Sequence, residues 1–244
     1  MGLRGPLERA EHAVEMLDRP APLADLTQCL ADVARLNAMF GGTRITLLEV
    51  KRLIASVPAG RAVTVLDVGT GGGDIPRALV RWARRAGRSI RVFALDRDPQ
   101  TLEIAARRLV AYPEIVLVRG DAVALPVRPA SIDVVLSALT LHHLQPEQAV
   151  EHLAEMDAAA RLGFVLNDLI RSRLAYAAVW VATRLFTRNR MSRHDGPLSV
   201  RRAYVPAEVR QLCEKAGLFD ARLRVHGPLM RQCAVRRKRP GRPG

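Results

Sequence analysis

Residues 63–74 read Val-Thr-Val-Leu-Asp-Val-Gly-Thr-Gly-Gly-Gly-Asp, and this stretch decides the fold. Its first half is apolar and β-branched, which is typical of a strand buried in a parallel sheet. The glycines that follow permit a left-handed backbone and leave room for a ligand against the main chain. A helical pattern begins directly after Asp74. The stretch therefore predicts a strand, a tight turn and a helix, with a cofactor bound at the turn.

The acid at position 74 bears on which cofactor the turn can hold. A dinucleotide fingerprint, Gly-x-Gly-x-x-Gly, places a pyrophosphate on the helix N-terminus. Gly69 and Gly71 fit that pattern, but Asp74 stands where its third glycine would be. A carboxylate there caps the helix and repels a pyrophosphate, so it favours a positively charged cofactor such as S-adenosylmethionine. A nicotinamide-linked oxidoreductase is disfavoured, and a P-loop is excluded because no Gly-Lys-Ser/Thr follows.

Residues 65–73, Val-Leu-Asp-Val-Gly-Thr-Gly-Gly-Gly, resemble the first motif of class I S-adenosylmethionine-dependent methyltransferases. Three later stretches follow in that family's order and spacing, so the resemblance covers residues 62–168. It implies an α/β fold with a doubly wound, Rossmann-like sheet of seven strands, the last of them antiparallel. It also implies which groups hold the methionine end of the cofactor. Asp67 supports the turn or takes the ammonium, and the turn itself is shaped by Gly69, Thr70, Gly71 and Gly73.

The second predicted strand, residues 89–96, ends on Asp96, which Arg97 follows. A carboxylate at the tip of this strand can accept hydrogen bonds from both ribose hydroxyls, as it does in nucleotide-binding folds. Capping of the next helix is a competing role, but Asp98 is better placed for it. We therefore assign Asp96, with Arg97 beside it, to the cofactor site.

Gly120-Asp121-Ala122 follows the third predicted strand. In the family, an acid at this place accepts the adenine amino group, and apolar neighbours such as Ala122 pack on the ring. A plain turn would also contain Gly-Asp. The fourth predicted strand, residues 131–137, ends on Ser137, which we include among the cofactor-binding residues.

The segment after the fourth strand, residues 138–147, reads Ala-Leu-Thr-Leu-His-His-Leu-Gln-Pro-Glu. In the family this strand end points at the transferred methyl group. The segment lacks the Asp/Asn-Pro-Pro-Tyr/Phe of nucleic-acid amino-methyltransferases and the Cys of cytosine C5 enzymes. Its Leu-His-His-Leu form resembles small-molecule methyltransferases instead.

A hydroxyl acceptor must lose a proton during methylation, and histidine is a suitable base. We predict that His143 is the catalytic base and that His142 is structural or lines the pocket. A role for both histidines in structure alone stays open. His194 is a second candidate base.

Apolar residues at helical spacing predict two helices before the glycine turn, over residues 23–40 and 45–57. We expect residues 1–60 to form an N-terminal helical cap that begins with a mobile arm over residues 1–22. Residues 61–244 are expected to form the S-adenosylmethionine-binding methyltransferase domain.

A helical insert on the substrate side is expected between strands five and six, over residues 170–204. It contains an amphipathic helix, residues 171–187, and a long polar loop, residues 188–200. The apolar face of the helix favours an aromatic or apolar acceptor. Ordinary packing and peripheral contact with a membrane surface are the alternatives.

The chain carries 38 Lys and Arg against 24 Asp and Glu, a net charge of +14. Such an excess can indicate nucleic-acid binding, but the arginines are spread along the chain, so a nucleic-acid partner is not favoured. The three cysteines are widely spaced and form no metal-binding pattern, so no metal site is predicted. With no secretion signal and no apolar run long enough to span a bilayer, a cytoplasmic location is expected. The basic tail, residues 237–244, is expected to be disordered.

The sequence therefore predicts a class I methyltransferase that transfers a methyl group from S-adenosylmethionine to a small molecule. The expected reaction is O-methylation of a phenolic, polyketide-like or quinone-like acceptor. The alternatives are an RNA methyltransferase and a regulatory protein that binds the cofactor without turnover. The sequence does not indicate an oligomeric state.

Overall fold

The computed structural model describes residues 7–227 and 230–238, and its centre is a seven-stranded sheet in the order β3-β2-β1-β4-β5-β7-β6. Strands β1 to β5 are parallel, whereas β7 runs antiparallel to both of its neighbours. This arrangement confirms the predicted doubly wound, Rossmann-like sheet with its antiparallel last strand. The strands are β1 (Val63–Val68), β2 (Ile90–Asp96), β3 (Ile115–Arg119), β4 (Ile132–Ala138), β5 (Ala160–Leu169), β6 (Arg222–His226) and β7 (Arg231–Arg237).

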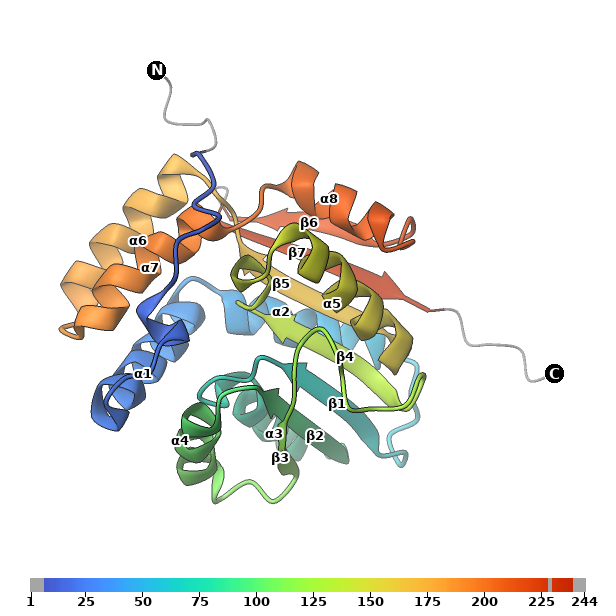
Figure 1. The fold of residues 1–244 in the computed structure, drawn as a ribbon. Helices are drawn as coiled ribbons and strands as arrows, with labels where there is room; N and C mark the ends of the chain where they lie inside the picture. The colour runs from blue at the N-terminus through green and yellow to red at the C-terminus, as the bar shows by residue number, and fades with distance from the viewer. Residues whose placement is uncertain (1–6, 228–229, 239–244) are drawn as a thin grey trace.

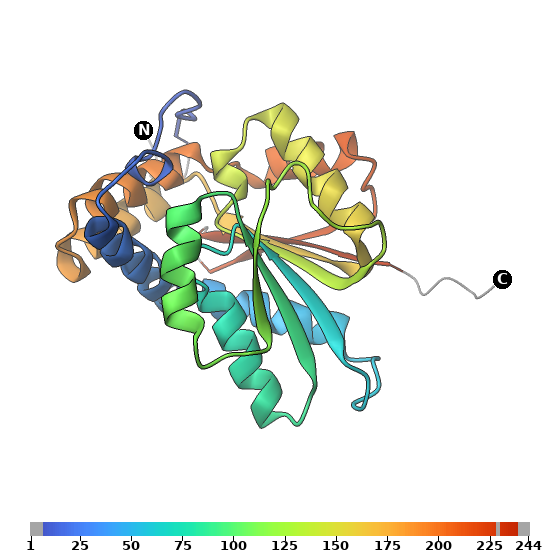
Figure 2. The same ribbon diagram turned by 60° about the horizontal axis from the view of Figure 1, so that its bottom comes forward.

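Helices pack on both faces of the sheet and also lie beyond one end of it (Figure 1, Figure 2). One face is covered by α2 and α3, and the other by α5 and α8. Helices α1, α6 and α7 lie beyond the carboxyl ends of the parallel strands. The helices are α1 (Leu23–Met39), α2 (Gly42–Leu53), α3 (Asp74–Arg85), α4 (Pro99–Leu109), α5 (Pro146–Ala159), α6 (Arg173–Phe186), α7 (Arg190–Arg202) and α8 (Pro206–Lys215), with two short 3-10 helices, η1 (Met16–Asp18) and η2 (Leu141–His143).

The apolar sequence of β1 and β4 is explained by burial on both faces of the sheet. Leu66 and Val135 pack in the core beneath α5 and α8, whereas Val65 and Val134 pack beneath α2 and α3. All four side chains are fully buried. This is the pattern that a central parallel strand requires, because helices cover it on each side.

The turn after β1 has the left-handed backbone that its glycines predict. Gly69 has φ +74°, and a Cβ on it would lie 2.3 Å from the Thr140 hydroxyl oxygen, in the segment after β4. The turn is thus in direct contact with the neighbouring strand end. This contact brings the cofactor turn and the histidine segment to one edge of the sheet.

The predicted loop over residues 188–200 is wrong, because most of it forms α7. Asn189 caps this helix by accepting hydrogen bonds from the amides of Met191 and Ser192. Gly196-Pro197 resembles a turn in the sequence, yet both residues lie inside the helix. Gly196 lies against Thr183 of α6, where a Cβ would come within 2.7 Å of a methyl group. Packing of α7 on α6 therefore overrides a weak local helix preference.

The predicted mobile arm is also wrong for residues 7–22, which pack against α7 and η2. The Ala10 amide donates to the carbonyl of Arg201, and the Arg9 guanidinium donates to the carbonyl of Leu144. The amides of Met16 and Leu17 both donate to the Asp195 carboxylate, at 2.8 and 2.9 Å. These partners lie far away in the sequence, so local composition gave no sign of them. Residues 1–6 lie outside the described part of the chain.

The two predicted helices of the N-terminal cap occupy different places in the fold. Within the predicted cap, α1 and residues 7–22 lie over the carboxyl ends of the strands, whereas α2 packs on the sheet beside α3. At the other terminus, Arg237 ends β7 and the Lys238 amide donates to the Leu162 carbonyl. The rest of the predicted basic tail, residues 239–244, lies outside the described residues.

The apolar face of α6 is partly exposed, at Leu174, Val181, Leu185 and Phe186. Within residues 7–227 and 230–238, no helix has the length and apolar character needed to cross a bilayer. Contact of α6 with a membrane surface stays a prediction.

Candidate active site

A cavity of about 660 Å³ lies at the carboxyl ends of β1, β2 and β4, where ligands bind in open α/β sheets. Residues 17–20 and α1 close it from the other side. Most of the predicted cofactor residues line this cavity. They are Asp67, Gly69, Thr70, Gly71, Asp96, Arg97, Gly120, Asp121 and Ala122.

Two predicted cofactor residues do not line the cavity. The Ser137 side chain is fully buried and its hydroxyl lies 3.1 Å from Nε2 of His152, on α5. Side chains alternate along a strand, so the Ser137 side chain faces α5 on one side of the sheet, whereas Ala138 lines the cavity. Gly73 forms the N-cap of α3, and its missing Cβ leaves room for Leu109 rather than for a ligand.

Three carboxylates make the glycine-turn end of the cavity strongly acidic. Asp67 accepts a hydrogen bond from the Thr70 hydroxyl at 2.7 Å, and Asp96 accepts one from the Gly71 amide at 2.9 Å. Asp74 begins α3 and also lines the cavity. Burial raises the pKa of all three side chains, and that of Asp67 reaches about 7. Asp74 and Asp96 also disfavour the charge of Asp67, so a cationic ligand would stabilise its ionised form.

The adenine end predicted for the cofactor is more open. Asp121 is exposed, and its carboxylate accepts a hydrogen bond from the Val123 amide at 3.2 Å. Ala122 lies beside it on the cavity wall. Arg97 pairs across the cavity mouth with Asp18, at 3.3 Å.

Adjacent histidines on one turn are expected to point in different directions, but the two rings of η2 lie side by side, with centroids 4.3 Å apart. His143 lines the cavity, and its Nδ1 lies 3.0 Å from the Asp18 carboxylate. His142 is buried, with Nδ1 2.8 Å from Asp168 at the end of β5. Leu139, just before η2, has φ +59°, a strained conformation for a branched side chain. This strained backbone links β4 to the turn that presents His143.

His194, the second candidate base, lies outside the cavity. Its side chain is half exposed on α7, and its Nδ1 lies 2.7 Å from the neighbouring Asp195 carboxylate. The helix that replaces the predicted loop thus turns this histidine away from the site.

No pattern in the sequence predicts three of the charged residues at the site. Glu15 and Asp18 come from the segment predicted to be mobile, and Arg202 ends α7. Arg202 donates to Asp18 at 3.1 Å and to the His143 carbonyl at 2.9 Å. Burial raises the pKa of Glu15 to about 7, whereas His143 and Arg202 overcome the burial of Asp18 and hold its pKa below the usual value. The partners of these groups are distant in sequence, so only the fold brings them together.

Residues 65–163 match the family model of a methyltransferase domain, and the sheet has the fold of known S-adenosylmethionine-dependent methyltransferase structures. Residues 65–163 therefore contain a methyltransferase domain, on the fold of the class I S-adenosylmethionine-dependent methyltransferases. The cofactor of this family is S-adenosylmethionine, and the cavity fits it. The acidic turn end suits a ligand with an ammonium and a sulfonium, and the glycines let it lie against the backbone.

The curated relatives match only part of their own length. The chain is 31% identical over 155 residues to the ribosomal protein L11 methyltransferase of Pelobacter propionicus, covering 57% of this chain and 48% of that protein. It is 44% identical over 69 residues to the 2-phytyl-1,4-naphtoquinone methyltransferase of Thermosynechococcus vestitus, covering 28% and 29%. The chain thus spans less than half the length of these two relatives.

Among solved structures, a SAM dependent methyltransferase from Aquifex aeolicus superposes with a TM-score of 0.55 at 17% identity. The match covers 88% of this chain and 98% of that one. At this level of identity the likeness establishes the shared fold.

Proposed function

We propose that this protein transfers the methyl group of S-adenosylmethionine to a hydroxyl oxygen of a small apolar molecule, of the phenolic, polyketide-like or quinone-like kind. One observation carries this proposal. His143 lines the same cavity as the glycine turn, and its Nδ1 is fixed by the Asp18 carboxylate. With the Nδ1 proton directed at Asp18, Nε2 is the ring nitrogen left to accept a proton.

The cofactor roles follow from where each carboxylate lies. Asp96, at the tip of β2, accepts the ribose hydroxyls, and Asp121 accepts the adenine amino group. Asp67 and Asp74 stabilise the ammonium at the methionine end. Gly69 and Gly71 allow the chain to pass close to the ligand, because neither carries a Cβ.

The reaction requires alignment and the removal of one proton. The acceptor oxygen forms a bond to the methyl carbon while the bond from that carbon to the sulfonium sulfur breaks, leaving a neutral thioether. His143 takes the hydroxyl proton, and Asp18 stabilises the imidazolium that forms. Most of the remaining rate enhancement comes from holding the two reactants in line.

The apolar part of the cavity supports an apolar acceptor. Side chains of α1, of η1 and of the segment around η2 form this part of the wall, namely Leu17, Leu26, Leu30, Val33, Leu139 and Leu144. The similarity to a naphthoquinone methyltransferase supports the same class of acceptor. The match to a ribosomal protein methyltransferase makes a protein acceptor a necessary control in the assay.

Two measurements test the proposal. Calorimetric titration of S-adenosylmethionine and S-adenosylhomocysteine into wild type should show binding that Asp96→Ala weakens strongly, with NADH as the negative control. Methyl transfer to a panel of phenols, polyketide-like molecules and quinols should then fall by about 10²- to 10⁴-fold in kcat in His143→Gln. Cofactor affinity should be unchanged in that variant.

Preferential NADH binding would contradict the assigned cofactor. Methyl transfer that is equally fast in His143→Gln would contradict the assigned base. The His194→Gln variant is the matched control, because His194 lies outside the cavity and should leave the rate unchanged.

A further inference from the structure

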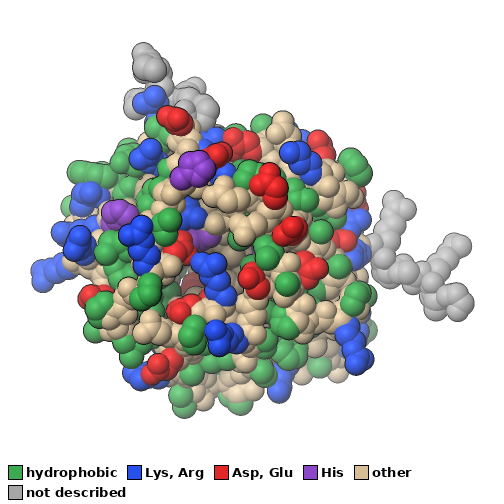
Figure 3. Space-filling model, in the orientation of Figure 1, with side chains coloured by type: hydrophobic (Ala, Val, Ile, Leu, Met, Phe, Trp, Pro, Cys, Tyr) green, Lys and Arg blue, Asp and Glu red, His purple; other side chains and the backbone are tan. Residues whose placement is uncertain are grey.

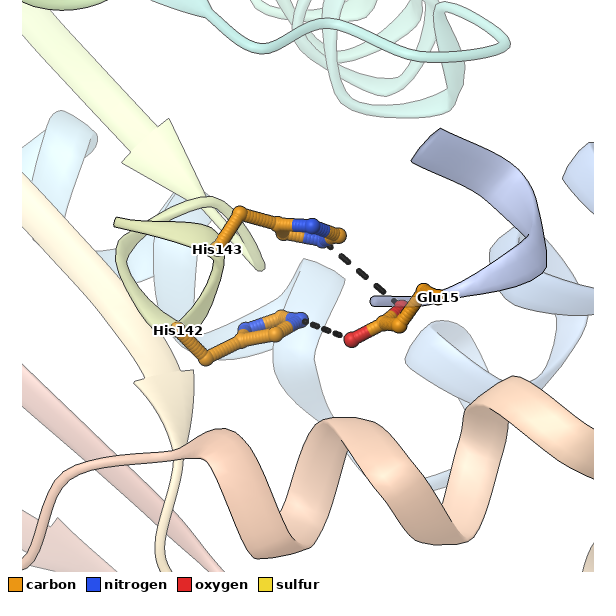
Figure 4. A group of neighbouring side chains, drawn as sticks. All are labelled: Glu15, His142 and His143. Carbon is orange, nitrogen blue, oxygen red and sulfur yellow. Dashed lines mark ion pairs between the residues drawn. The ribbon is translucent and has the colours of Figure 1, made fainter. Parts of the chain in front are cut away.

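Two histidines and a glutamate converge without hydrogen-bonding one another, and one of them, His143, lines the cavity (Figure 4). Nε2 of His142 lies 3.7 Å from one carboxylate oxygen of Glu15, and Nε2 of His143 lies 3.9 Å from the other. We propose that Glu15, His142 and His143 bind a divalent transition-metal ion, with an open coordination position toward the cavity. No metal site was expected from the sequence, because Glu15 lies far along the chain from the adjacent His142 and His143.

The spacing of the three ligands fits an ion better than direct hydrogen bonds. Hydrogen bonds between nitrogen and oxygen span about 2.7–3.2 Å, shorter than either of these separations. Ligand atoms about 2.0–2.1 Å from a tetrahedral ion lie about 3.3 Å apart. One ligand atom from each of the three residues lies within 4.8 Å of the other two. Rotation of these side chains that shortens the separations by up to about 1.5 Å would complete the coordination sphere.

Both histidines are oriented as metal-ligating histidines usually are. A ligating imidazole commonly donates its second ring N–H to a carboxylate, which fixes the tautomer and the ring direction. Here Nδ1 of His142 lies 2.8 Å from Asp168, and Nδ1 of His143 lies 3.0 Å from Asp18. Asp168 also accepts a hydrogen bond from the His142 amide at 3.0 Å, which holds it in place. Each ring thus directs its Nε2 lone pair at Glu15.

Glu15 is the part of the cluster that most needs a partner. Its side chain is 2% exposed, and within the described part of the chain its Oε1 accepts no hydrogen bond. A buried carboxylate is costly unless a cation or hydrogen-bond donors satisfy it. Arg202 comes within 3.7 Å of Glu15, but it lies closer to Asp18, at 3.1 Å. A metal ion between the two imidazoles would supply the missing contacts.

The donor set indicates the class of metal. Two imidazole nitrogens and one carboxylate suit Zn²⁺, Co²⁺ or Fe²⁺, whereas Mg²⁺ and Ca²⁺ prefer sites built from oxygen alone. Two further carboxylates, Asp18 and Asp168, surround the ligands. Arg202 and Arg97 pair with Asp18, and the buried Arg231 guanidinium acts on Asp168. Glu15 is thus the carboxylate of this group that a metal ion would neutralise.

The ion would act on the acceptor from the open position. Of the three ligands, His143 lines the cavity, so we place the fourth position on its side of the cluster, toward the space in which the acceptor must bind. A hydroxyl oxygen bound there loses its proton to solvent more readily, because the ion stabilises the alkoxide or phenolate. This role rests on the proposed methyl transfer and is the alternative to proton transfer to His143 when the ion is bound; the binding of the metal does not depend on either.

The test begins with metal binding alone. The full chain is freed of metal with a chelator and titrated with Co²⁺, followed by visible absorption, and then with Zn²⁺ in competition. We expect one Co²⁺ to bind with the intense visible bands of a low-coordinate site, and Zn²⁺ to displace it. Glu15→Gln, His142→Ala and His143→Ala should each lose these bands. Asp168→Asn should weaken binding by about 10- to 100-fold.

Matched controls separate the site from adventitious binding. His12→Ala and His194→Ala alter exposed histidines outside the cluster and should leave Co²⁺ binding unchanged. Binding that persists equally in the three ligand variants would overturn the proposal, as would the absence of the cobalt bands in wild type. If a ligand variant unfolds, the cobalt bands of wild type and the weaker metal binding of Asp168→Asn still test the proposal.

The outcome is distinguishable from that of the proposed function. Metal binding without S-adenosylmethionine binding or methyl transfer would contradict the function and leave the metal site standing. Full methyl transfer by metal-free protein, combined with the loss of kcat in His143→Gln, would show that His143 acts as a base and would overturn the metal's role.

Discussion

Asp67 carries a buried carboxylate whose ionisation depends on what occupies the cavity. Burial raises its pKa to about 7, and Asp74 and Asp96 add to that effect, while the Thr70 hydroxyl opposes it. Between its ordinary pKa and pH 7, the folded protein binds more protons than the unfolded chain. The free energy of unfolding of the cofactor-free protein should therefore decrease as the pH rises through this range.

Binding of S-adenosylmethionine should reverse this effect and release protons. The cofactor's ammonium favours the ionised form of Asp67 and lowers its pKa, so affinity should increase as the pH is raised from 6 to 8. Calorimetry at pH 6.5 in two buffers of different ionisation enthalpy measures the released protons. The release should fall in Asp67→Asn. If the variant releases as many protons as wild type, the titrating group is Asp74 or Asp96 instead.

At the scale of single elements, the turn after β1 depends on a close contact rather than on flexibility. Gly69 and Gly41 have almost the same left-handed φ, +74° and +77°. A Cβ on Gly69 would strike the Thr140 hydroxyl, whereas a Cβ on Gly41 meets nothing within 4 Å. Comparing alanine variants of the two glycines therefore separates the cost of backbone strain from the cost of disturbing the contact between the turn and Thr140.

Alanine at either position should destabilise the protein by about 1–2 kcal/mol through backbone strain alone. Gly69→Ala should be less stable than Gly41→Ala, because the turn and Thr140 must move apart. It should also weaken S-adenosylmethionine binding, whereas Gly41→Ala should retain it. Urea unfolding and calorimetric titration measure the two effects. Equal stability and equal affinity in both variants would show that the Gly69–Thr140 contact is unimportant.

Asp195 of α7 is one of the residues that hold segment 7–22 in place. Asp195 is buried and accepts hydrogen bonds from the amides of Met16 and Leu17. Hydrogen bonds to a charged group are worth about 1.5–3 kcal/mol each. Asp195→Ala should therefore release the segment that carries Glu15 and Asp18, with faster amide exchange there and slower methyl transfer.

Hydrogen-exchange mass spectrometry of residues 10–18 checks this expectation, with Glu151→Ala, an exposed residue of α5, as the control. Unchanged exchange in Asp195→Ala would mean that Arg9 and Ala10 hold the segment without help. The expected effect is confined to the cavity wall, so the rest of the sheet should keep its protection.

These elements also show what the sequence could and could not predict. The glycine turn and the tips of β1, β2 and β3 follow patterns of adjacent residues, so their positions were predictable. The doubly wound sheet with its antiparallel last strand followed from the resemblance to a known family. Helix α7 was missed because Gly196-Pro197 reads as a turn, and only packing against α6 keeps it helical. Glu15, Asp18 and Arg202 were missed because each becomes functional only through contacts with distant parts of the chain.

Across the whole molecule, the fold places two kinds of chemistry at one edge of the sheet. Three acids at the ends of β1 and β2 and the start of α3 form the cofactor end of the cavity. Asp18 and His143 line the other side of the cavity, where the proposed function places the acceptor, and Arg202 of α7 pairs with Asp18. The first set belongs to the sheet core and the second to the layer above it. Variation of that outer layer can thus change the acceptor while the cofactor site is kept.

The net charge of +14 is also a property of the whole molecule, and it bears on the RNA methyltransferase alternative. On the face shown in Figure 3, basic and acidic side chains are interspersed rather than gathered into one basic surface. Non-specific attraction to phosphates releases counterions and weakens steeply with salt. We therefore expect any binding to RNA to be independent of sequence and to be lost by about 200 mM salt.

Fluorescence anisotropy with two unrelated RNAs across a salt series measures the binding. A methyl-label assay measures whether the RNA is methylated. Saturating RNA at low salt should leave S-adenosylmethionine affinity unchanged, because the cavity is acidic and repels phosphates. No label should enter the RNA. Sequence-dependent binding that survives high salt, with label transferred to one of the RNAs, would instead identify nucleic acid as the acceptor, and the apolar wall of the cavity would then need another role.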